Sequence, residues 1–464
     1  MDENARTGTQ AWRLAPATRP GTIEGFADRV SAVAGDRVGL FVSTTEPAFR
    51  VEAYRMGFYQ GLGARRVWAS GPIPGVEQGR PHRQPGTNMV EAPWSKSVDI
   101  DVDSSWPPGV YLLKLAADGV AQRYVPLTIR DDSSTAALVV QSSVTTWQAY
   151  NQWGGYNLYE GGSGSGSFER RARVVSFDRP YARGDGAGDL VGLELPLVAM
   201  AESLGLDVTY WTDVDLHARP ELLTRHRALL SLGHDEYWTR AMRDGAEKAR
   251  DHGVNLAFLG SNAVFRQIRL ASSPLGPDRR EVGYKSASAD PIRRTNPAEV
   301  TVNWREAPVS RPESSLIGQQ YECNPVRADM VVADGAAWVF AGTGLHTGDK
   351  LSGTIGEEYD RYNPNDPGPG NVQLLAHSPV RCGGRPSFAD MTYYSAPSGA
   401  GVFASGTNWW VTKLVPACPA GSCPHDPAVI QITHNLLDAF AAGPAGLAHP
   451  SVANYEAVRR AVRG

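Results

Sequence analysis

Residues 229–238 read Leu-Leu-Ser-Leu-Gly-His-Asp-Glu-Tyr-Trp, an apolar strand that runs out into a polar segment. The helical pattern that follows predicts a strand-to-helix junction at His234 and Glu236. In open α/β sheets, ligands bind at the carboxyl ends of strands, so both side chains are site candidates. A second strand, residues 254–259, ends in Gly-Ser-Asn at Asn262. We therefore expect His234, Glu236 and Asn262 to meet in one polar crevice.

Residues 133–464 alternate apolar runs with helical patterns. Continuous apolar runs at 136–140 and 173–177 predict strands that are covered on both faces. Helical spacing at 193–204 and from 238 to 251 separates further strands. This alternation predicts a largely parallel sheet with helices on both faces, as in the class I glutamine amidotransferase-like fold. Later segments predict strands at 330–332, 338–341 and 401–405 and a closing helix at 433–440.

The preceding residues follow a different pattern. From about residue 22 to 132, short alternating segments are separated by turn signals, with no helical stretch of note. Strands at this spacing are typical of an immunoglobulin-like β-sandwich. The polar segment 131–135 is typical of a linker. The predicted fold class is thus α/β with two domains, an N-terminal β-sandwich over residues 1–132 and an α/β catalytic domain over residues 133–464.

Composition excludes several classes of function. The 464 residues carry a formal net charge of −4, which provides no broad basic surface for nucleic acid. No apolar run approaches the roughly 18 residues that a membrane-spanning helix needs. The first residues, Met-Asp-Glu-Asn, lack the basic start and apolar core of a secretory signal, which predicts a cytoplasmic protein while leaving export open.

Tyrosines follow two of the predicted strands. The first strand leads to Tyr150, and the strand at 173–177 leads to Tyr181, so both are expected on the same rim as Glu236. One carboxylate and two phenols suit a hard, highly charged cation, and this set would select Fe(III). Plainer interpretations compete with this one. Aromatic clusters such as the one around Tyr150 often serve packing or sugar stacking, His234 and Glu236 could form a structural pair, and Asn262 could cap a helix.

Several segments together resemble the catalytic domain of the N,N-dimethylformamidase large-subunit family. They are Thr-Trp-Gln-Ala-Tyr-Asn at 146–151, Phe-Asp-Arg-Pro-Tyr at 177–181, Gly-His-Asp-Glu-Tyr-Trp at 233–238, Gly-Ser-Asn at 260–262, Gly-Glu-Glu-Tyr-Asp at 356–360 and Gly-Thr-Asn-Trp-Trp at 406–410. The resemblance spans roughly residues 136 to 445. Tyr-Arg-Met-Gly-Phe-Tyr at 54–59 and Trp-Pro-Pro-Gly-Val-Tyr at 106–111 also resemble the β-domain that precedes it.

The resemblance implies a mononuclear iron held by two tyrosines and a glutamate. By motif, the glutamate is Glu236 and the tyrosines are Tyr181 and Tyr150, with Tyr156 or Tyr159 as substitutes. The catalytic set that the resemblance implies is His234, Asn262 and Glu358. His234 and Asn262 match substrate-orienting positions, and Glu358 matches a carboxylate that assists water. The family also has a small subunit, which has no counterpart within this chain.

The predicted function is therefore iron-dependent hydrolysis of the C–N bond of a small amide. Polarisation by a ferric ion, proton transfer by Glu358 or His234, and an orienting contact from Asn262 would supply this chemistry. The long segments 265–325 and 344–370 are expected to shape the pocket. The partners expected are the small amide substrate and a second copy of the chain in a homodimer, with the small subunit left open.

Two other functions compete with amide hydrolysis by iron. A thiol hydrolase needs a cysteine nucleophile, for which Cys323 is the best candidate among four cysteines. A carbohydrate-binding or structural module would use some of the twelve tryptophans without catalysis. Cys323 and Cys382 could equally pair or stay as buried thiols, and Cys418 could bridge Cys423 across its loop.

Overall fold

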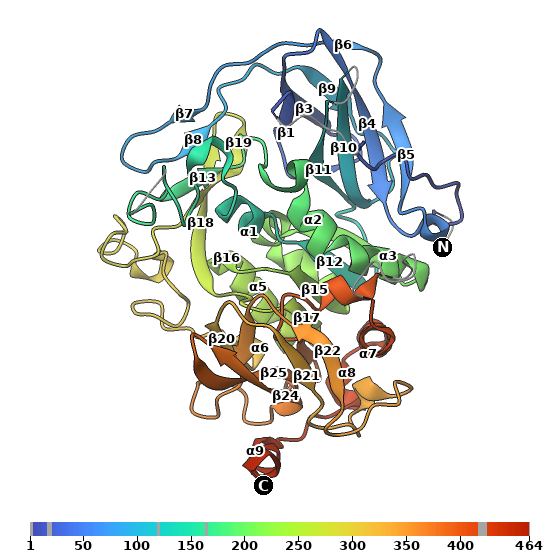
Figure 1. The fold of residues 1–464 in the computed structure, drawn as a ribbon, viewed down its shortest axis with the longest axis vertical. Helices are drawn as coiled ribbons and strands as arrows, with labels where there is room; N and C mark the ends of the chain where they lie inside the picture. Colours follow the sequence, from blue (N-terminus) through green and yellow to red (C-terminus); the bar gives the residue numbers. More distant parts are fainter. Residues whose placement is uncertain (1–2, 16–20, 118–120, 163–165, 416–424, 464) are drawn as a thin grey trace.

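The computed structural model describes residues 3–15, 21–117, 121–162, 166–415 and 425–463. Figure 1 shows the early strands at one end of the molecule and the C-terminal helix α9 at the other. The chain has the mixed α/β architecture that the sequence predicts, with several sheets. In the parts of the chain that the structure describes, no helix combines the length and apolarity needed to cross a bilayer.

Two sheets form the first part of the chain. One has the order β1-β3-β9, and the other has the order β2-β11-β10-β4-β5 with β6 paired to β4. Their bounds are β1 Ile23–Ala27, β2 Ser31–Val33, β3 Arg37–Thr44, β4 Ala48–Met56, β5 Ala64–Ala69, β6 Ile73–Pro74, β9 Val98–Asp101, β10 Gly109–Ala117 and β11 Gln122–Arg130. Apolar side chains from both sheets pack in one core.

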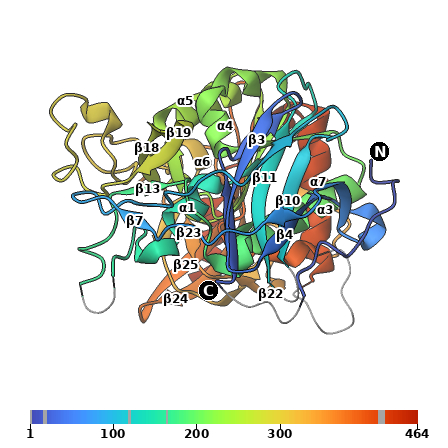
Figure 2. The same cartoon turned by 90° about the horizontal axis from the view of Figure 1, so that it is seen from above.

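Strand β10 explains how this part meets the rest of the molecule. Because strand side chains alternate between faces, Tyr111, Leu113 and Leu115 enter the core between the two sheets. Val110 and Leu112 point the other way, into the core of the central sheet. Seen from above, β4, β10 and β11 lie over the remainder of the chain (Figure 2). The middle of the larger early sheet is therefore buried on both faces.

A seven-stranded sheet forms the centre, with the order β14-β12-β15-β17-β26-β25-β24. The strands from β14 to β26 are parallel, and β25 is antiparallel to both of its neighbours. Their bounds are β12 Leu138–Ser142, β14 Val208–Thr212, β15 Ala228–Gly233, β17 Asn255–Gly260, β24 Gln373–Cys382, β25 Arg385–Ser395 and β26 Gly401–Ala404.

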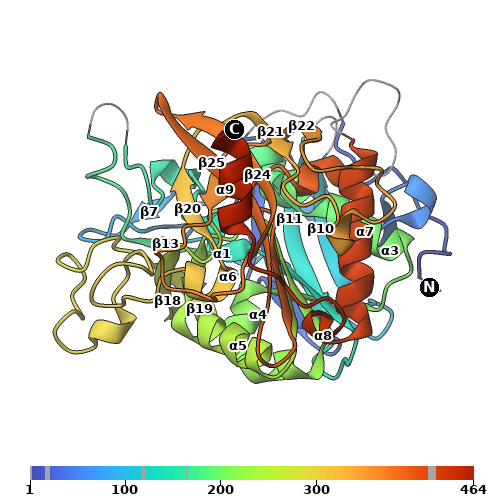
Figure 3. The same cartoon turned by 90° about the horizontal axis from the view of Figure 1, so that it is seen from below.

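Helices cover both faces of this sheet, which explains its continuous apolar strands. Side chains of α5 (Arg240–Asp251) pack on one face, and those of α3 (Leu195–Ser203) and α7 (Pro427–Ala442) pack on the other. Figure 3 shows α5 and α7 on different sides of the central strands. The other helices are α1 Val144–Ala149, α2 Gly188–Leu193, α4 Asp213–Ala218, α6 Ser314–Ile317, α8 Ala445–Ala448 and α9 Tyr455–Arg463.

Smaller sheets flank the centre. The order β13-β19-β18-β16 joins Val174–Ser176, Gly276–Val282, Arg266–Ser273 and Tyr237–Thr239. The remaining pairs are β20 (Gln320–Cys323) with β23 (Tyr359–Arg361), β21 (Ala328–Val331) with β22 (Lys350–Ile355), and β7 (His82–Arg83) with β8 (Val90–Glu91).

Three sequence predictions are corrected here. The strand at 173–177 does not join the central sheet, because β13 pairs antiparallel with β19. The helix expected from 238 begins at Arg240, since residues 237–239 form the short strand β16 beside β18. The strand expected at 338–341 is a single turn of 3₁₀ helix over Trp338–Phe340.

Candidate functional site

The junction after β15 and the junction after β17 lie side by side. Gly233 and Gly260 are paired at the ends of these two parallel strands. A Cβ on Gly260 would lie 1.7 Å from the carbonyl oxygen of Gly233, so only glycine permits this close approach. Gly233 has φ +60°, a left-handed conformation that glycine adopts easily. The register thus brings the segment of His234 and the segment of Asn262 to the same edge, as the sequence predicts.

Glu236 is held in place by helix α1. Its backbone N–H donates to the Thr146 hydroxyl at 2.9 Å, and the N–H of Tyr237 donates to the same oxygen at 3.3 Å. The carboxylate is fully buried. It lies beside the end of α1, from which Tyr150 projects.

Two phenol hydroxyls meet the carboxylate of Glu236. The Tyr150 hydroxyl donates to Oε2 at 2.6 Å, and the Tyr159 hydroxyl donates to Oε1 at 2.7 Å. The two phenol oxygens are themselves 2.8 Å apart, and the rings stack with centroids 4.5 Å apart. We call Tyr150, Tyr159 and Glu236 the oxygen cluster.

Asn157 fixes the second tyrosine of the oxygen cluster. Its side-chain oxygen accepts the Tyr159 N–H at 2.8 Å, while its amide nitrogen donates to the carbonyl oxygen of Tyr150 at 3.1 Å. One side chain therefore joins the backbone segments of both phenols. This bridge holds the loop after α1 in the turn that returns Tyr159 to Glu236.

Burial and nearby charges shift the pKa of the carboxylate and the pKa values of the two phenols of the oxygen cluster in opposite directions. Burial opposes ionisation of Glu236, but His234 and the Arg266 guanidinium favour the carboxylate and lower its pKa to about 2. Burial and the Glu236 charge raise the pKa of Tyr150 and Tyr159 well above the usual value. Both phenols therefore keep their protons unless a bound cation displaces those protons.

His234 lies between two carboxylates. Its Nε2 is 3.4 Å from Glu236 Oε2 and 3.5 Å from Glu358 Oε2. Burial lowers the pKa of the imidazole, but Glu358 and Glu236 outweigh this effect and raise it to about 9. Burial raises the pKa of Glu358 above its ordinary value. At neutral pH this arrangement holds an imidazolium beside a carboxylate that binds protons more readily than usual.

Asn262 completes this group of polar side chains. Its Nδ2 lies 3.5 Å from His234 Nε2, and its backbone N–H donates to Asp360 at 2.7 Å. Its side-chain oxygen is buried without a hydrogen-bond partner among the described residues. The helix-capping interpretation of Asn262 is wrong, because the chain continues into strand β18 and the residue adopts φ +57°.

Tyr181 lies elsewhere, and its expected place beside Glu236 is corrected. Its ring packs edge-on against Trp147 at 6.1 Å, and no hydrogen bond joins it to Tyr150, Tyr159 or Glu236. The reason is topological, because β13 leads to Tyr181 from a different sheet. Of the two substitutes named from the resemblance, Tyr159 takes this place, whereas the Tyr156 ring faces the Arg83 guanidinium at 5.3 Å.

Lys285 lies at the site although it was not among the residues predicted from the sequence. Its Nζ atom lies 3.0 Å from the centroid of the Tyr159 ring and is buried with no hydrogen-bond partner among the described residues. Burial lowers its pKa well below the ordinary value. No local pattern marks this lysine, although it falls within the segment 265–325 that was expected to shape the pocket. Arg266, from the same segment, lies 3.4 Å from Glu236 Oε1.

A small cavity reaches this site. It has a volume of about 20 Å³ and is bordered by Thr146, Tyr150, Arg183, Asp189 and His234, among others. That volume is enough for about one water molecule. A reactant of very small size could thus approach His234 from this side.

The oxygen cluster is also the best candidate for a metal centre. No group of three His, Cys, Asp or Glu side chains able to hold an ion occurs within the described ranges, so phenol oxygens would be required. Two phenols and one carboxylate are hard donors of the kind that ferric iron takes. The donor chemistry therefore fits Fe(III), once the two phenol protons are displaced.

The described residues offer neither competing function a free thiol or a fully exposed indole ring. Cys323 is bonded to Cys382, so it is not a free thiol nucleophile. Cys418 and Cys423 lie outside the described residues. Each of the twelve tryptophans is buried or half-buried, which leaves no exposed indole platform for sugar stacking.

A family model described as N,N-dimethylformamidase beta subunit-like, C-terminal, matches residues 50–422. The chain therefore belongs to this family of dimethylformamidase-like proteins. The match begins within β4, so it covers most of the early sheets as well as the central sheet. A comparison with individually curated proteins found no match.

Proposed function

We propose that this protein is an iron-dependent amidohydrolase that cleaves the C–N bond of a small amide. The observation that carries the proposal is the oxygen cluster, set directly beside His234 and Glu358. Membership in the dimethylformamidase-like family supports hydrolysis of a carbon–nitrogen bond outside peptides.

Tyr150, Tyr159 and Glu236 would hold the ferric ion. When bound, such an ion polarises a carbonyl oxygen and lowers the pKa of water. The protein's part is to bury three hard donors with fixed backbones. Arg266 would keep Glu236 ionised, and its positive charge would also favour the ionised form of the Tyr159 phenol.

The other polar residues would move protons and orient the substrate. Glu358 has one carboxylate oxygen without a hydrogen-bond partner among the residues that the structure describes, and its pKa is raised, which suits a base that takes a proton from water. His234 is protonated at neutral pH and could return a proton to the departing amine. The amide group of Asn262 could hold the substrate oxygen as negative charge develops on it.

Metal analysis with an activity screen tests this function. We expect about one iron per chain, a tyrosinate-to-iron absorption band in the visible, and hydrolysis of short N-alkyl formamides or acetamides. Glu236→Ala should lose the iron, the band and the activity together. Glu221→Ala, at an exposed glutamate, is the matched control and should keep all three. A colourless, metal-free protein with full activity would contradict the proposal.

The proposal also covers the protein's partner subunits and its cellular compartment. The beta subunit-like description of the family suggests a separate small subunit, and mass measurement of the purified chain would distinguish this from a homodimer. Structural disulfides are rare in the reducing cytosol, so the Cys323–Cys382 bond favours an oxidising compartment over the predicted cytoplasmic location.

The proposal also includes the fold class of each part of the chain. We propose that the two early sheets belong to the β-sandwich class and the central sheet to the glutamine amidotransferase-like class. The domain division at residues 132 and 133 is part of that proposal. The shared core of β1, β3, β4, β10 and β11 and the parallel strand order support it.

A further inference from the structure

Glu358 is anchored by a residue outside the central sheet. Its Oε1 accepts a hydrogen bond from Asn324 Nδ2 at 2.7 Å. Its Oε2 lies 3.5 Å from His234 Nε2 and has no hydrogen-bond partner among the described residues. The bond from Asn324 therefore decides which oxygen of Glu358 faces His234.

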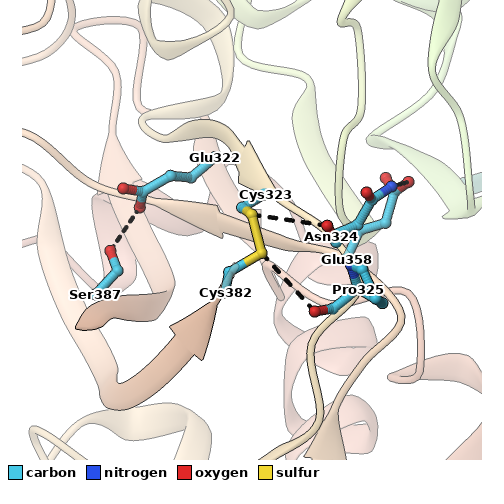
Figure 4. Close-up of a disulfide and its surroundings, with 7 residues drawn as sticks. All are labelled: Glu322, Cys323, Asn324, Pro325, Glu358, Cys382 and Ser387. Carbon is cyan, nitrogen blue, oxygen red and sulfur yellow. Dashed lines mark hydrogen bonds between the residues drawn. A yellow bond between two sulfur atoms is a disulfide. The ribbon is translucent and has the colours of Figure 1, made fainter. Parts of the chain in front are cut away.

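A disulfide holds the backbone next to Asn324. Cys323 is bonded to Cys382, the last residue of β24, with the two Cα atoms 6.3 Å apart. Figure 4 shows Asn324 and Glu358 together on one side of this bond. Cys323 is also paired with Tyr359 across the β20–β23 ladder. The disulfide thus ties the segment that carries Asn324 to the tip of the β24–β25 hairpin.

Other contacts hold the rest of β20 independently of the disulfide. Glu322 accepts a hydrogen bond from the Ser387 hydroxyl at 2.9 Å and pairs with Arg361 at 3.1 Å. In contrast, Asn324 and the following Pro325 are exposed, and Cys323 is only half-buried. Loss of the S–S bond should therefore loosen Asn324 and Pro325, which lie between the end of the β20 ladder and the hydrogen bond from the Val326 N–H to the Glu357 carbonyl oxygen, while β20 stays in place.

We propose that Asn324 and the Cys323–Cys382 disulfide form a redox-dependent clamp that positions Glu358 against His234. This inference rests on the proposed function, in which Glu358 accepts the proton of water. Asn324 is a positioning residue, because it acts on the reaction only through the Glu358 carboxylate. Cys323 is half-buried and Cys382 is buried, so a small thiol would approach the S–S bond from the side of Cys323.

The redox step needs a dithiol as reductant. A thiolate of the dithiol attacks one sulfur of the bond, which breaks the S–S bond and forms a mixed disulfide. The second thiol of the reductant then displaces the protein sulfur and closes the reductant's own disulfide. Two electrons and two protons pass to the protein, and Cys323 and Cys382 become thiols.

Steady-state kinetics on the iron-loaded full chain provide the first test. Reduction with dithiothreitol, Cys323→Ala/Cys382→Ala and Asn324→Ala should each lower kcat by about tenfold or more, because general-base catalysis contributes about 10²–10⁴ and is partly lost. KM should change less than about twofold on the same reasoning, since Glu358 acts in the chemical step. Iron content and the tyrosinate band should stay constant, because the clamp touches no member of the oxygen cluster. Asn324→Gln, which keeps the amide donor, should recover part of the kcat.

The matched control uses the second pair of cysteines. Cys418→Ala/Cys423→Ala should remain sensitive to dithiothreitol, whereas Cys323→Ala/Cys382→Ala should become insensitive to it. If kcat stays constant while thiol titration shows that Cys323 and Cys382 are fully reduced, the clamp is excluded.

Hydrogen exchange followed by mass spectrometry separates the clamp from the proposed function. Reduction should speed amide exchange at residues 323–326 and 356–359 and leave residues 144–150 and 234–240 unchanged. This result without hydrolysis of any amide would retain the clamp and reject the hydrolase. Unchanged exchange at 356–359 after complete reduction would reject the clamp, whatever the activity.

Discussion

The hydroxyl of Tyr159 donates a 2.7 Å hydrogen bond to the carboxylate of Glu236, although 77 positions separate the two residues in the chain. This contact, with the 2.6 Å bond from Tyr150, defines the oxygen cluster. The loop after α1 makes it possible, because it folds back so that the two tyrosine rings stack. The proposed metal centre is therefore built from one loop and one strand end.

Tyrosine variants test this geometry. Tyr159→Phe should reduce bound iron by about tenfold or more, because loss of one of three ligands removes a charged donor. Any remaining tyrosinate band should weaken and shift. Tyr181→Phe is the matched control, since Tyr181 packs against Trp147 and should leave iron and colour intact. Loss of colour in Tyr181→Phe with retention in Tyr159→Phe would reverse the assignment.

The raised pKa of His234 predicts a pH-dependent stability in the metal-free protein. Below the ordinary value of 6.5 the imidazole is charged in both states, and its stabilising contacts with Glu358 and Glu236 are fully present. As the pH rises through the folded pKa of about 9, the charge and the stabilisation are lost. Urea unfolding of wild type and His234→Gln should show a difference that falls by on the order of 1–3 kcal/mol across this interval. If the difference in the free energy of unfolding between the two proteins did not change with pH, the prediction that His234 is charged in the folded protein would be wrong.

Gly260→Ala should damage the junction between β15 and β17. The new methyl would lie 1.7 Å from the Gly233 carbonyl oxygen, so the strands must separate or the backbone must shift. We expect a loss of about 1–3 kcal/mol in the free energy of unfolding. Gly192→Ala is the control, because nothing lies within 4 Å of its Cβ position and alanine favours the helix there. Equal stability of the two variants in denaturant titrations would show that the close approach is absent.

A buried ion pair joins the early sheets to the central part of the chain. Arg55 of β4 lies 2.6 Å from Glu202 of α3, with side chains only 6% and 2% exposed. Glu202→Gln should lower the free energy of unfolding by about 3 kcal/mol, because it leaves the guanidinium buried without its counter-charge.

The control for this pair is Asp101→Asn. The Arg37–Asp101 pair has side chains that are 65% and 73% exposed, so its removal should cause no measurable change in denaturant unfolding. A Glu202→Gln variant as stable as the wild type would indicate that this ion pair contributes nothing to the contact between the two parts of the chain.

Local pattern was sufficient to predict one edge of the site. The apolar strands before His234 and before Asn262 are read directly from the sequence, and parallel neighbours end at the same edge of a sheet. The resemblance to a known family named Glu358, which lies 3.5 Å from His234. The roles of these residues stay predictions until variants are measured.

Sequence alone could not assign the second tyrosine, Lys285 or the Asn324 clamp. A strand of three residues such as β13 has the same apolar pattern in any sheet, so its membership, and with it the place of Tyr181, is invisible in the chain. Lys285 and Asn324 lie in irregular segments without periodicity. Two cysteines separated by 59 positions likewise give no indication of whether they pair.

The sequence by itself determined which strands are apolar, where they end and which polar residues follow them, because these properties depend on neighbours in the chain. Only the tertiary structure decided that Tyr159 and not Tyr181 is hydrogen-bonded to Glu236, and that Asn324 is hydrogen-bonded to Glu358. Those contacts depend on which strands pair and on the path of the loops between them. Both are determined by the free energy of packing the whole chain, which no local stretch of sequence contains.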